Sequence, residues 1–408
     1  MQTVVIGGGP AGLISAYFRA IRNESVFLVE KNEKLGKKLY ITGKGRCNVT
    51  NDCDETEFLS NVVSNPKFLS GAIRRFPPRK FMEFLEEKVA LKTERGNRVF
   101  PLSDKASDIT RTLERYAAEA GVKIRLNEKV LSLGVENGAV KNVVTDKGKI
   151  ECDNVIVCTG GLSYPSTGSS GDGYEFARSV GHSIVPPVSA LAGINLKGDF
   201  YKKLQGLTLK NVGISVYFNG KKIYSDFGEM LFTHFGISGP IVISASSYIN
   251  RLNLNDVYIS LDLKPALDES TLDARVLRDF EKYKNKSVKN SFDDLLLKSL
   301  IPVVLEKAAV NGEIKNSEFK SDERKKIVKT IKDLRMYPYS LRDISEAIVT
   351  AGGVSVKEID PKTMESKLIK GLFFAGEIID TDALTGGFNI TIAACTAYSA
   401  GNAEVKGE

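Results

Sequence analysis

The sequence predicts an α/β fold in which a parallel-sheet domain is built from both ends of the chain and interrupted by an insertion. Three observations lead to this prediction. Residues 3–30 read as strand, glycine turn, helix and second strand. Residues 371–401 show a similar order of elements: an apolar strand, several glycines and an alanine-rich helix. Between them, from about residue 190 to 335, the sequence becomes strand-rich and then helical and rich in Lys, Glu and Asp.

The composition is that of an ordinary globular protein of more than one domain. The 408 residues are 42% hydrophobic and 26% charged, and the chain is too long for one compact core. No apolar run reaches the roughly 18 residues of a membrane span, and no export signal is visible, so we expect a cytoplasmic protein. The five cysteines contain no C-x-x-C pair, which argues against a disulfide framework. The net charge of +7 comes from basic residues scattered among acids, which favours solvated surfaces over a nucleic-acid site.

The first element is a strand that ends in a glycine-rich turn. Thr3–Ile6 is a short β-branched run, and Gly7, Gly9 and Gly12 after it form the pattern G-x-G-x-x-G. In a dinucleotide-binding fold these glycines allow the tight turn, the approach of a pyrophosphate and close helix packing. Pro10 and Ala11 open the helix predicted over residues 11–22, whose N-terminus would face the phosphates.

The second strand, Ser25–Val29, leads to an acid. Glu30 lies 18 residues beyond Gly12, close to the ~20 expected for a carboxylate that binds a ribose hydroxyl. A carboxylate there disfavours a 2′-phosphorylated dinucleotide, because two anions would meet. The opening of the chain therefore predicts a site for NAD or FAD.

The elements that follow are expected to complete this domain. Residues 31–51, rich in glycine and lysine, read as a ligand-side loop. Helical patterns cover 55–88, with breaks at Pro66 and Pro77-Pro78, and 105–120. Residues 122–150 alternate like a β-meander. A buried strand then runs through Asn154–Val157 to Thr159 and Gly160, and residues 176–181 read as a short helix and its cap.

The residue pattern of the insertion changes along its length, from strand-like to helical. Residues 190–263 are strand-like, with a hairpin at Asn219-Gly220, and predict a small β-barrel or sandwich. Residues 267–334 predict helices, and 337–349 an extended segment.

The C-terminal part decides between the two cofactors. The strand Leu372–Ala375 is followed by Gly376 and Glu377, and Gly386 and Gly387 then open a helix. The positive end of that helix would face a flavin and stabilise the charge that a reduced flavin carries. Reduced nicotinamide gains no such charge, so FAD is favoured, bound non-covalently.

Several ordered motifs resemble one bacterial family of NAD(P)/FAD-dependent oxidoreductases, which includes a bile-acid enone reductase and an aminoacetone oxidase. Beyond the first fingerprint, the motifs are TGKGRCNVTN (42–51), THFGISGP (233–240), TAGGV (350–354), PKTMESK (361–367) and GLFFAGE…TGGFN (371–389). The resemblance covers essentially the whole chain, although the tail after Asn389 differs from the family's longer aromatic version. It implies a Rossmann-like, glutathione-reductase-type FAD domain (1–189 and 351–408), a β-barrel domain (190–265 and 336–350) and a helical subdomain (266–335).

The predicted cofactor-binding residues lie in five stretches of the chain. They are Gly7, Gly9, Pro10, Ala11 and Gly12; Glu30, Lys31 and Lys38; Gly45, Arg46, Cys47 and Asn48; Thr159 and Gly160; and Gly376, Glu377, Gly386, Gly387, Asn389 and Ile390. For Arg46 an anion clamp and a surface ion pair both stay open. Cys47 lies in a basic loop that could lower its pKa, although a packed or flavin-adjacent role fits its lack of a partner thiol better.

Only two histidines are present. His234 is the candidate catalytic residue, as a proton donor to a substrate carbonyl or enolate, with a hydrogen-bonded barrel histidine as the alternative. His182, at a helix end, fits a structural cap. No residue spacing predicts a metal site.

We therefore expect an FAD-dependent oxidoreductase that transfers hydride from NAD(P)H, bound transiently, through flavin to an activated C=C of a small molecule. The substrate is expected at a domain junction, and the chain to be a monomer or homodimer without membrane contact. One alternative is an oxidase of an amino ketone or amine that uses oxygen. The other is a flavin-containing RNA-binding or RNA-modifying protein; an aromatic-interleaved basic strand face would support it, and none is visible in the sequence.

Overall fold

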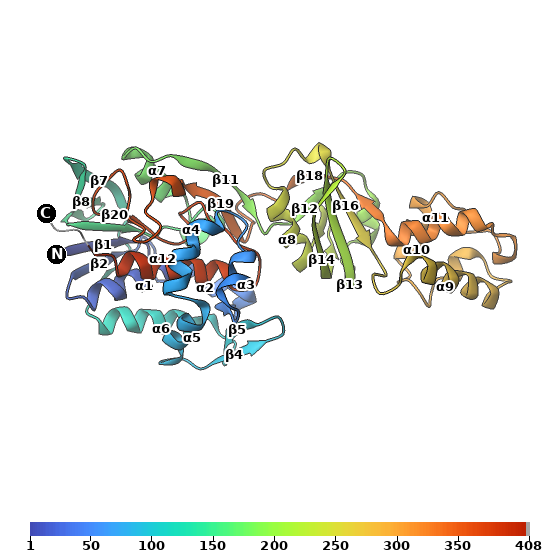
Figure 1. The fold of residues 1–408 in the computed structure, drawn as a ribbon, viewed down its shortest axis with the longest axis horizontal. Helices are drawn as coiled ribbons and strands as arrows, with labels where there is room; N and C mark the ends of the chain where they lie inside the picture. The colour runs from blue at the N-terminus through green and yellow to red at the C-terminus, as the bar shows by residue number, and fades with distance from the viewer. Residues whose placement is uncertain (405–408) are drawn as a thin grey trace. The chain divides into compact units, whose positions relative to one another are not determined.

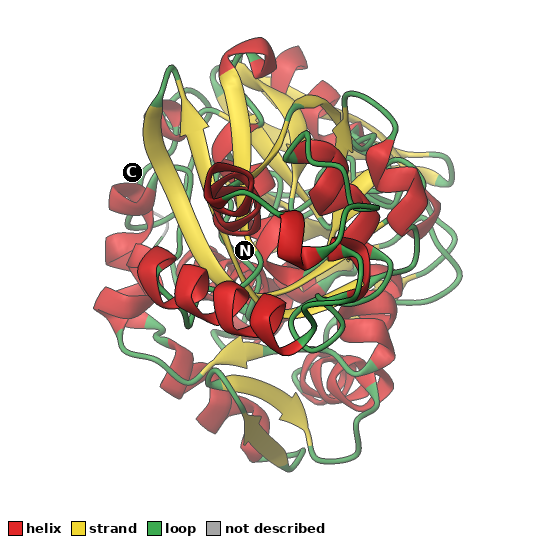
Figure 2. Ribbon diagram, turned by 90° about the vertical axis from the view of Figure 1, so that its right-hand side faces the viewer, coloured by secondary structure: helices red, strands yellow, loops and turns green. Residues whose placement is uncertain are grey.

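The computed structural model describes residues 1–404, which form two compact units. The first unit joins residues 1–190 to the chain from Ile344 onward, and the second is Leu191–Asp343. In Figure 1 the first unit contains both the blue N-terminal and the red C-terminal segments. Both units combine helices and strands (Figure 2). Across residues 1–404, no helix has both the length and the apolar character that crossing a membrane requires.

A five-stranded parallel sheet organises the first unit. Its order is β20-β10-β1-β2-β6, with bounds β1 Gln2–Ile6, β2 Ser25–Val29, β6 Lys123–Arg125, β10 Asn154–Val157 and β20 Leu372–Phe374. Every neighbouring pair is parallel. The placement of β6 corrects the predicted meander, because residues 123–125 return after a helical crossover and pair in parallel with β2.

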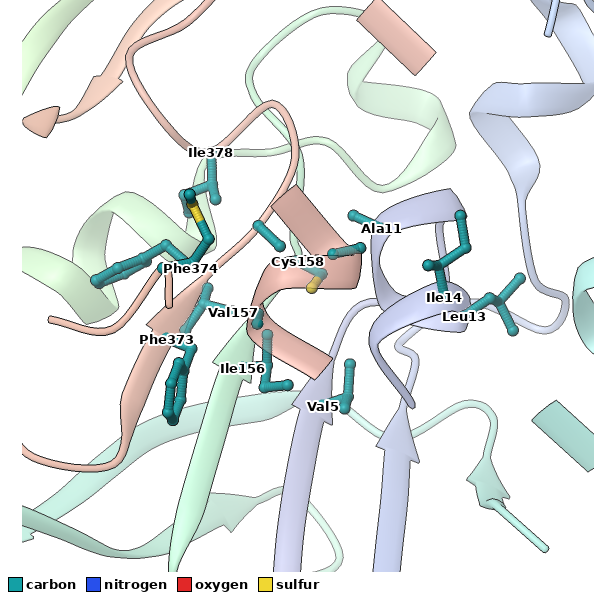
Figure 3. Close-up of a cluster of buried hydrophobic side chains, with 14 of the residues drawn as sticks. Val5, Ala11, Leu13, Ile14, Ile156, Val157, Cys158, Phe373, Phe374 and Ile378 are labelled. Carbon is teal, nitrogen blue, oxygen red and sulfur yellow. The ribbon is translucent and has the colours of Figure 1, made fainter. Parts of the chain in front are cut away.

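Helices that cover this sheet pack closely on one another. Helix α1 (Pro10–Ala20) lies against α6 (Ala106–Glu119) and α12 (Phe388–Gly401). A Cβ on Gly401 would lie 2.6 Å from Phe18 Cβ, so α12 and α1 approach at a glycine. Helix α12 is buried on most sides, which fits its small and apolar residues. Figure 3 shows part of the resulting core, in which Val5 and Ile156 come from the sheet and Ala11 from α1.

Smaller elements complete the first unit. The predicted meander is present as β7 (Val130–Glu136), β8 (Ala139–Thr145) and β9 (Gly148–Glu151). Prolines begin two of the helices in the 55–88 stretch, as predicted. The remaining elements are α2 (Lys37–Ile41), β3 (Thr50–Asn51), α3 (Glu55–Ser60), α4 (Pro66–Arg75), α5 (Pro78–Glu86), β4 (Leu91–Glu94), β5 (Arg98–Pro101), α7 (Asp172–Ser179), β11 (Ile184–Ala190) and β19 (Val349–Val354). Two of these correct the prediction, since α2 lies in the stretch read as a loop and α7 begins four residues before the expected start.

A seven-stranded antiparallel sheet forms the second unit, where a barrel or sandwich was predicted. Its order is β17-β16-β13-β14-β15-β12-β18, with bounds β12 Ile194–Leu196, β13 Thr208–Phe218, β14 Lys221–Phe232, β15 Gly236–Ser238, β16 Val257–Asp262, β17 Leu334–Met336 and β18 Pro338–Leu341. The hairpin at Asn219-Gly220 joins β13 to β14, as predicted. One helix, α8 (Pro240–Ile249), interrupts the run that was read as all strands; Pro240 starts it after Gly239, and its apolar residues pack on β14.

The predicted helical stretch is present in the second unit as α9 (Glu269–Lys282), α10 (Leu300–Lys307) and α11 (Ser321–Lys332). Its buried side chains, such as Val304 and Ile331, belong to the same apolar cluster as Val212 and Leu261 of the sheet. Residues 344–350, predicted to belong with the barrel, lie in the first unit, where β19 pairs with β11. The division of the insertion into barrel and helical subdomains stays a prediction.

Candidate active site

Four neighbouring strands of the parallel sheet end side by side. The register pairs Ile6 with Val29 and with Val157, and Val157 with Phe374. Each of these residues is the last of its strand, so the loops that follow all leave from one edge. Ligands of open parallel sheets bind at this carboxyl edge. The structure thus brings together the predicted residues that follow β1, β2, β10 and β20.

The three glycines after β1 have different surroundings. Gly7 has φ +103°, and a Cβ there would lie 2.6 Å from the Cys158 carbonyl oxygen. A Cβ on Gly12 would lie only 1.8 Å from the Gly7 carbonyl oxygen, so no side chain fits between turn and helix. A Cβ on Gly9, in contrast, would meet no protein atom within 4 Å. Gly9 is therefore the glycine that faces open space, as a pyrophosphate site requires.

The start of α1 is prepared for an anion. Pro10 occupies its first turn, Gly9 provides no capping side chain, and no acid lies in the first turn. The N–H groups of Ala11 and Gly12 have no partner within the helix, because the carbonyls four residues earlier precede it. These donors and the helix dipole fit a phosphate group.

Glu30 is held in one orientation at the end of β2. Its Oε2 accepts a hydrogen bond from the Gly8 N–H at 2.7 Å, and its Oε1 accepts from the Asn32 N–H at 2.8 Å and from Asn32 Nδ2 at 2.6 Å. The residue is 8% exposed. Its carboxylate thus ties the glycine turn to the β2 loop and keeps lone pairs that a ribose hydroxyl could use. Lys31 beside it is paired with Asp172 at 2.6 Å.

Two of the orphaned polar atoms lie in loops that the sequence predicts to hold the cofactor. Within residues 1–404, Asn48 Oδ1 and Thr159 Oγ1 are buried and have no hydrogen-bond partner. Buried polar atoms are nearly always satisfied, so such atoms point to a missing partner. Gly160, with φ +73°, carries the chain on from Thr159. Together with the space at Gly9, these atoms fit a polar, extended cofactor such as FAD.

A network around Glu377 lies in the loop after β20. Lys38 Nζ donates to Glu377 Oε2 at 2.6 Å and to Ser163 Oγ at 2.5 Å, and the Thr350 N–H donates to Glu377 Oε1 at 2.9 Å. A Cβ on Gly376 would lie 2.9 Å from Ala11 Cβ, so this loop touches the start of α1. Sequence analysis predicted Lys38 and Glu377 but missed Ser163 and Thr350. Two signals in the sequence could have indicated them: Ser163 lies in the loop that follows β10, and Thr350 is the first residue of the TAGGV motif.

The start of α12 is shaped by glycines, as predicted. Gly387 has φ +98°, and a Cβ there would lie 2.4 Å from the Thr50 carbonyl oxygen; Gly386 has φ +135°. The Asn389 side chain bonds backbone at residues 383 and 384, with Nδ2 2.7 Å from the Ala383 oxygen. Asn389 therefore shapes the loop before the helix. Ile390 is half-buried beside it.

In the loop of residues 42–48, the structure shows which of the two predicted roles the Arg46 side chain has. The Arg46 guanidinium pairs with Glu94 and with Asp104, 2.6 Å away, and lies 4.2 Å from the centroid of the Phe100 ring. The Arg46 guanidinium therefore donates to protein carboxylates, which fits the predicted ion pair better than an anion clamp. Gly45 has φ +86° and lets the chain turn back.

Cys47 corrects one expectation. The residue is fully buried, and burial raises the pKa of its thiol from about 9 to about 12. The basic loop therefore does not activate this thiol, because desolvation of the thiolate outweighs the hydrogen bond with Thr42 that opposes it.

We expect Cys47 to stay unmodified when the native protein is treated with iodoacetamide at about pH 8, and to react once the chain is unfolded, because a thiol with pKa near 12 carries almost no thiolate there. Mass spectrometry of tryptic peptides measures this. The raised pKa also means that the thiol's contribution to stability is present below pH 9 and is lost as the pH rises toward 12. Rapid native labelling of Cys47 at pH 8 would contradict the assignment.

The two histidines differ in their environment. His234 is exposed in the turn between β14 and β15 of the second unit, with Phe235 edge-on at 5.1 Å. Its role as proton donor stays a prediction. His182 is 4% exposed; its ring nitrogens lie 3.1 Å from Glu358 Oε2 and 2.7 Å from Ser366 Oγ, which fits a structural role. Within residues 1–404, no group of three His, Cys, Asp or Glu side chains could hold a metal ion.

Comparisons with known proteins agree with this fold. The family model described as "HI0933-like protein Rossmann domain" matches residues 1–403. The chain is 29% identical to a 3-dehydro-bile acid delta(4,6)-reductase of Clostridium scindens, over 98% of both proteins. It is 28% identical to the ribosomal RNA dihydrouridine synthase of Escherichia coli, over 98% of this chain and 96% of that protein.

A solved structure shares the fold at low sequence identity. The open conformation of a flavocytochrome c3 fumarate reductase superposes with a TM-score of 0.52 at 18% identity, and the match covers 98% of this chain and 77% of the other. The chain belongs to the HI0933-like Rossmann-domain family, a family of flavoprotein oxidoreductases.

Proposed function

We propose that this protein reduces a carbon–carbon double bond conjugated to a carbonyl group, with FAD as cofactor and NAD(P)H as a transient electron donor. The observation that carries the cofactor assignment is the alignment of four strand ends, which places the Gly7–Gly12 turn, Glu30, Thr159 and Glu377 at one edge. When bound, FAD supplies hydride transfer between donor and acceptor.

Each group at the sheet edge has a proposed role in holding the cofactor. The N–H groups at the start of α1 bind pyrophosphate, and Glu30 accepts from the adenosine ribose. Asn48 Oδ1 and Thr159 Oγ1, which lack partners within residues 1–404, are available to cofactor hydroxyl or N–H groups. The Glu377 carboxylate, fixed by Lys38, orients a ribityl hydroxyl. The start of α12 places positive potential where reduced flavin is negative.

The acceptor class follows from the chemistry named in the relatives. A 3-dehydro-bile acid delta(4,6)-reductase acts on double bonds conjugated to a 3-oxo group. The product named in dihydrouridine synthase lacks the uracil C5=C6 bond, which is conjugated to the C4 carbonyl. Reduction of such a conjugated bond adds hydride to the alkene carbon farther from the carbonyl and a proton to the nearer one. His234 is the proposed proton donor, with ordered water as the alternative.

A small-molecule enone is the first candidate acceptor, and its test is anaerobic stopped-flow absorbance. Purified, FAD-loaded protein is mixed with NADH or NADPH, and we expect rapid bleaching of the flavin band by one of them. Addition of a 3-oxo-Δ4,6 steroid should then restore the flavin band, and mass spectrometry should detect a steroid product that has gained two hydrogens at one C=C bond. Bleaching by neither nicotinamide would overturn the donor, and reoxidation by air with an amino ketone as reductant would favour an oxidase instead.

Uridine in ribosomal RNA is the second candidate acceptor, favoured by the full-length similarity to the E. coli enzyme. The same reduced protein is mixed with ribosomal RNA that lacks modifications. Nucleoside mass spectrometry that detects dihydrouridine, with no turnover of the steroid, would select this acceptor. Turnover of the steroid alone would select the first.

A further inference from the structure

One face of the sheet in the second unit carries aromatic, hydroxyl and basic side chains in register. On it, Tyr217 of β13 faces Tyr258 of β16 on one side and Lys222 of β14 on the other. We call this surface the tyrosine face. The alternate residues of these strands, such as Val216 and Ile259, point into the core. A groove of about 660 Å³ lies over the tyrosine face.

The aromatic rings on this face are pre-arranged for stacking. Tyr217 and Tyr258 stack with their centroids 4.6 Å apart and their planes 4° from parallel. The Arg335 guanidinium lies 5.0 Å from the centroid of the Tyr258 ring. Phe227, at the other end of the groove, is 55% exposed, and Tyr337, next to Tyr258, is 48% exposed. Large exposed aromatic side chains in a groove mark a binding surface.

Hydroxyl groups form a second row beside the rings. Ser215 faces Ser225 on β14 and Ser260 on β16, and Ser260 faces Arg335 on β17. Hydroxyls both donate and accept, so this row suits a ligand with many polar oxygens.

The charge of the chain is concentrated in the second unit. Residues 191–343 contain 25 Lys and Arg against 19 Asp and Glu, so this unit carries +6 of the total net charge of +7. Two of the three acids that line the groove are in ion pairs, Asp262 with Lys332 at 2.6 Å and Asp333 with Arg335 at 2.8 Å. The third, Asp226, accepts a hydrogen bond from the neutral Tyr224 hydroxyl at 2.8 Å and keeps its charge.

Lys222 differs from Lys332 and Arg335 because its ammonium group is not in an ion pair within residues 1–404. Among the residues that the structure describes, no carboxylate lies within 4.0 Å of its ammonium group, and Lys221 next to it is equally exposed. The free positive charge therefore lies at the edge of the groove, beside the stacked rings. A unit with surplus positive charge and an aromatic groove complements a polyanion that carries planar rings.

We propose that the tyrosine face binds single-stranded RNA. Bases stack on Phe227 and on the Tyr217 ring, which the stacked Tyr258 ring supports from behind. Phosphates lie toward Lys222, and the serine row contacts ribose 2′-hydroxyls. This proposal departs from the expectation that the chain has no aromatic-interleaved basic strand face. The face was invisible in the sequence because its residues come from four strands, with only one to three on each.

Fluorescence anisotropy with a labelled oligouridine of about 12 nucleotides tests the proposal on the full FAD-loaded chain. Tyr258→Leu removes a ring and should weaken binding about tenfold, whereas Tyr258→Phe keeps the ring and should bind as wild type. Lys222→Gln should lower the slope of log K against log salt by about 0.7, the value for one lost phosphate contact. Lys284→Gln is the matched control. Lys284 is exposed and lies outside the groove, so this variant makes the same change in net charge and should leave the slope unchanged.

Several outcomes would overturn the proposal. These are absence of oligouridine binding by the wild-type protein, equal binding of Tyr258→Leu and wild type, equal slopes for Lys222→Gln and wild type, and binding of duplex RNA or anionic vesicles as tight as that of single strands. Flavin content and circular dichroism of each variant show whether it has folded. The proposal rests on the ribosomal-RNA acceptor proposed above; because the assay needs no turnover, RNA binding and reduction of the acceptor can fail separately.

Discussion

Replacing Gly12 by valine is expected to abolish FAD binding and to destabilise the first unit by about 3 kcal/mol. A Cβ at this position would lie 1.8 Å from the Gly7 carbonyl oxygen, so helix α1 would have to move away from the turn after β1. That movement would displace the N–H groups that are proposed to bind pyrophosphate. Flavin absorbance of the purified variant and its denaturant unfolding curve measure the two effects.

Gly9→Ala provides the matched control. Gly9 has φ −80° and ψ −176°, which alanine adopts without strain, and its Cβ would meet no protein atom within 4 Å. The free energy of unfolding should therefore change by less than about 1 kcal/mol, while FAD affinity falls by at least about tenfold because the methyl group occupies the ligand's space. Equal FAD affinity in Gly9→Ala and wild type would show that the pyrophosphate lies elsewhere.

Glu30→Gln is expected to weaken FAD binding by about 1.5–3 kcal/mol, or roughly 10- to 100-fold. The carboxylate accepts hydrogen bonds on both oxygens, from the Gly8 N–H and from Asn32. An amide of the same shape must turn its NH₂ group toward one of these donors, which leaves two donors facing each other in a buried site. The affinity of the apoprotein for FAD, measured by fluorescence quenching, gives the magnitude.

Glu33→Gln removes a carboxylate three residues away and serves as the comparison for charge. The Glu33 side chain is 61% exposed and pairs with Lys37, so its replacement should leave FAD affinity within about twofold of wild type. If both variants bound FAD equally well, the ribose role of Glu30 would be wrong, and its function would be limited to joining the two loops.

Local sequence patterns predicted the elements of the first unit well. The β1 and β2 strands, the glycine turn and the start of α12 depend on neighbours in sequence, since periodicity and the conformational freedom of glycine act over a few residues. The same patterns failed where a long-range partner decides. Residues 123–125 alternate like a meander strand and pair with β2, and α8 packs on a sheet that the sequence read as continuous.

The sequence by itself determined the cofactor class, because G-x-G-x-x-G with Glu30 and the glycines before α12 is a local pattern tied to one chemistry. Only the tertiary structure decided which side chains are free to act. It engaged Arg46 with two carboxylates, buried Cys47 and made Glu377 the centre of a network with Lys38, Ser163 and Thr350. It also assembled the tyrosine face from four strands. Burial and pairing are properties of neighbours in space, and a β-sheet brings together residues whose separation along the chain carries no signal.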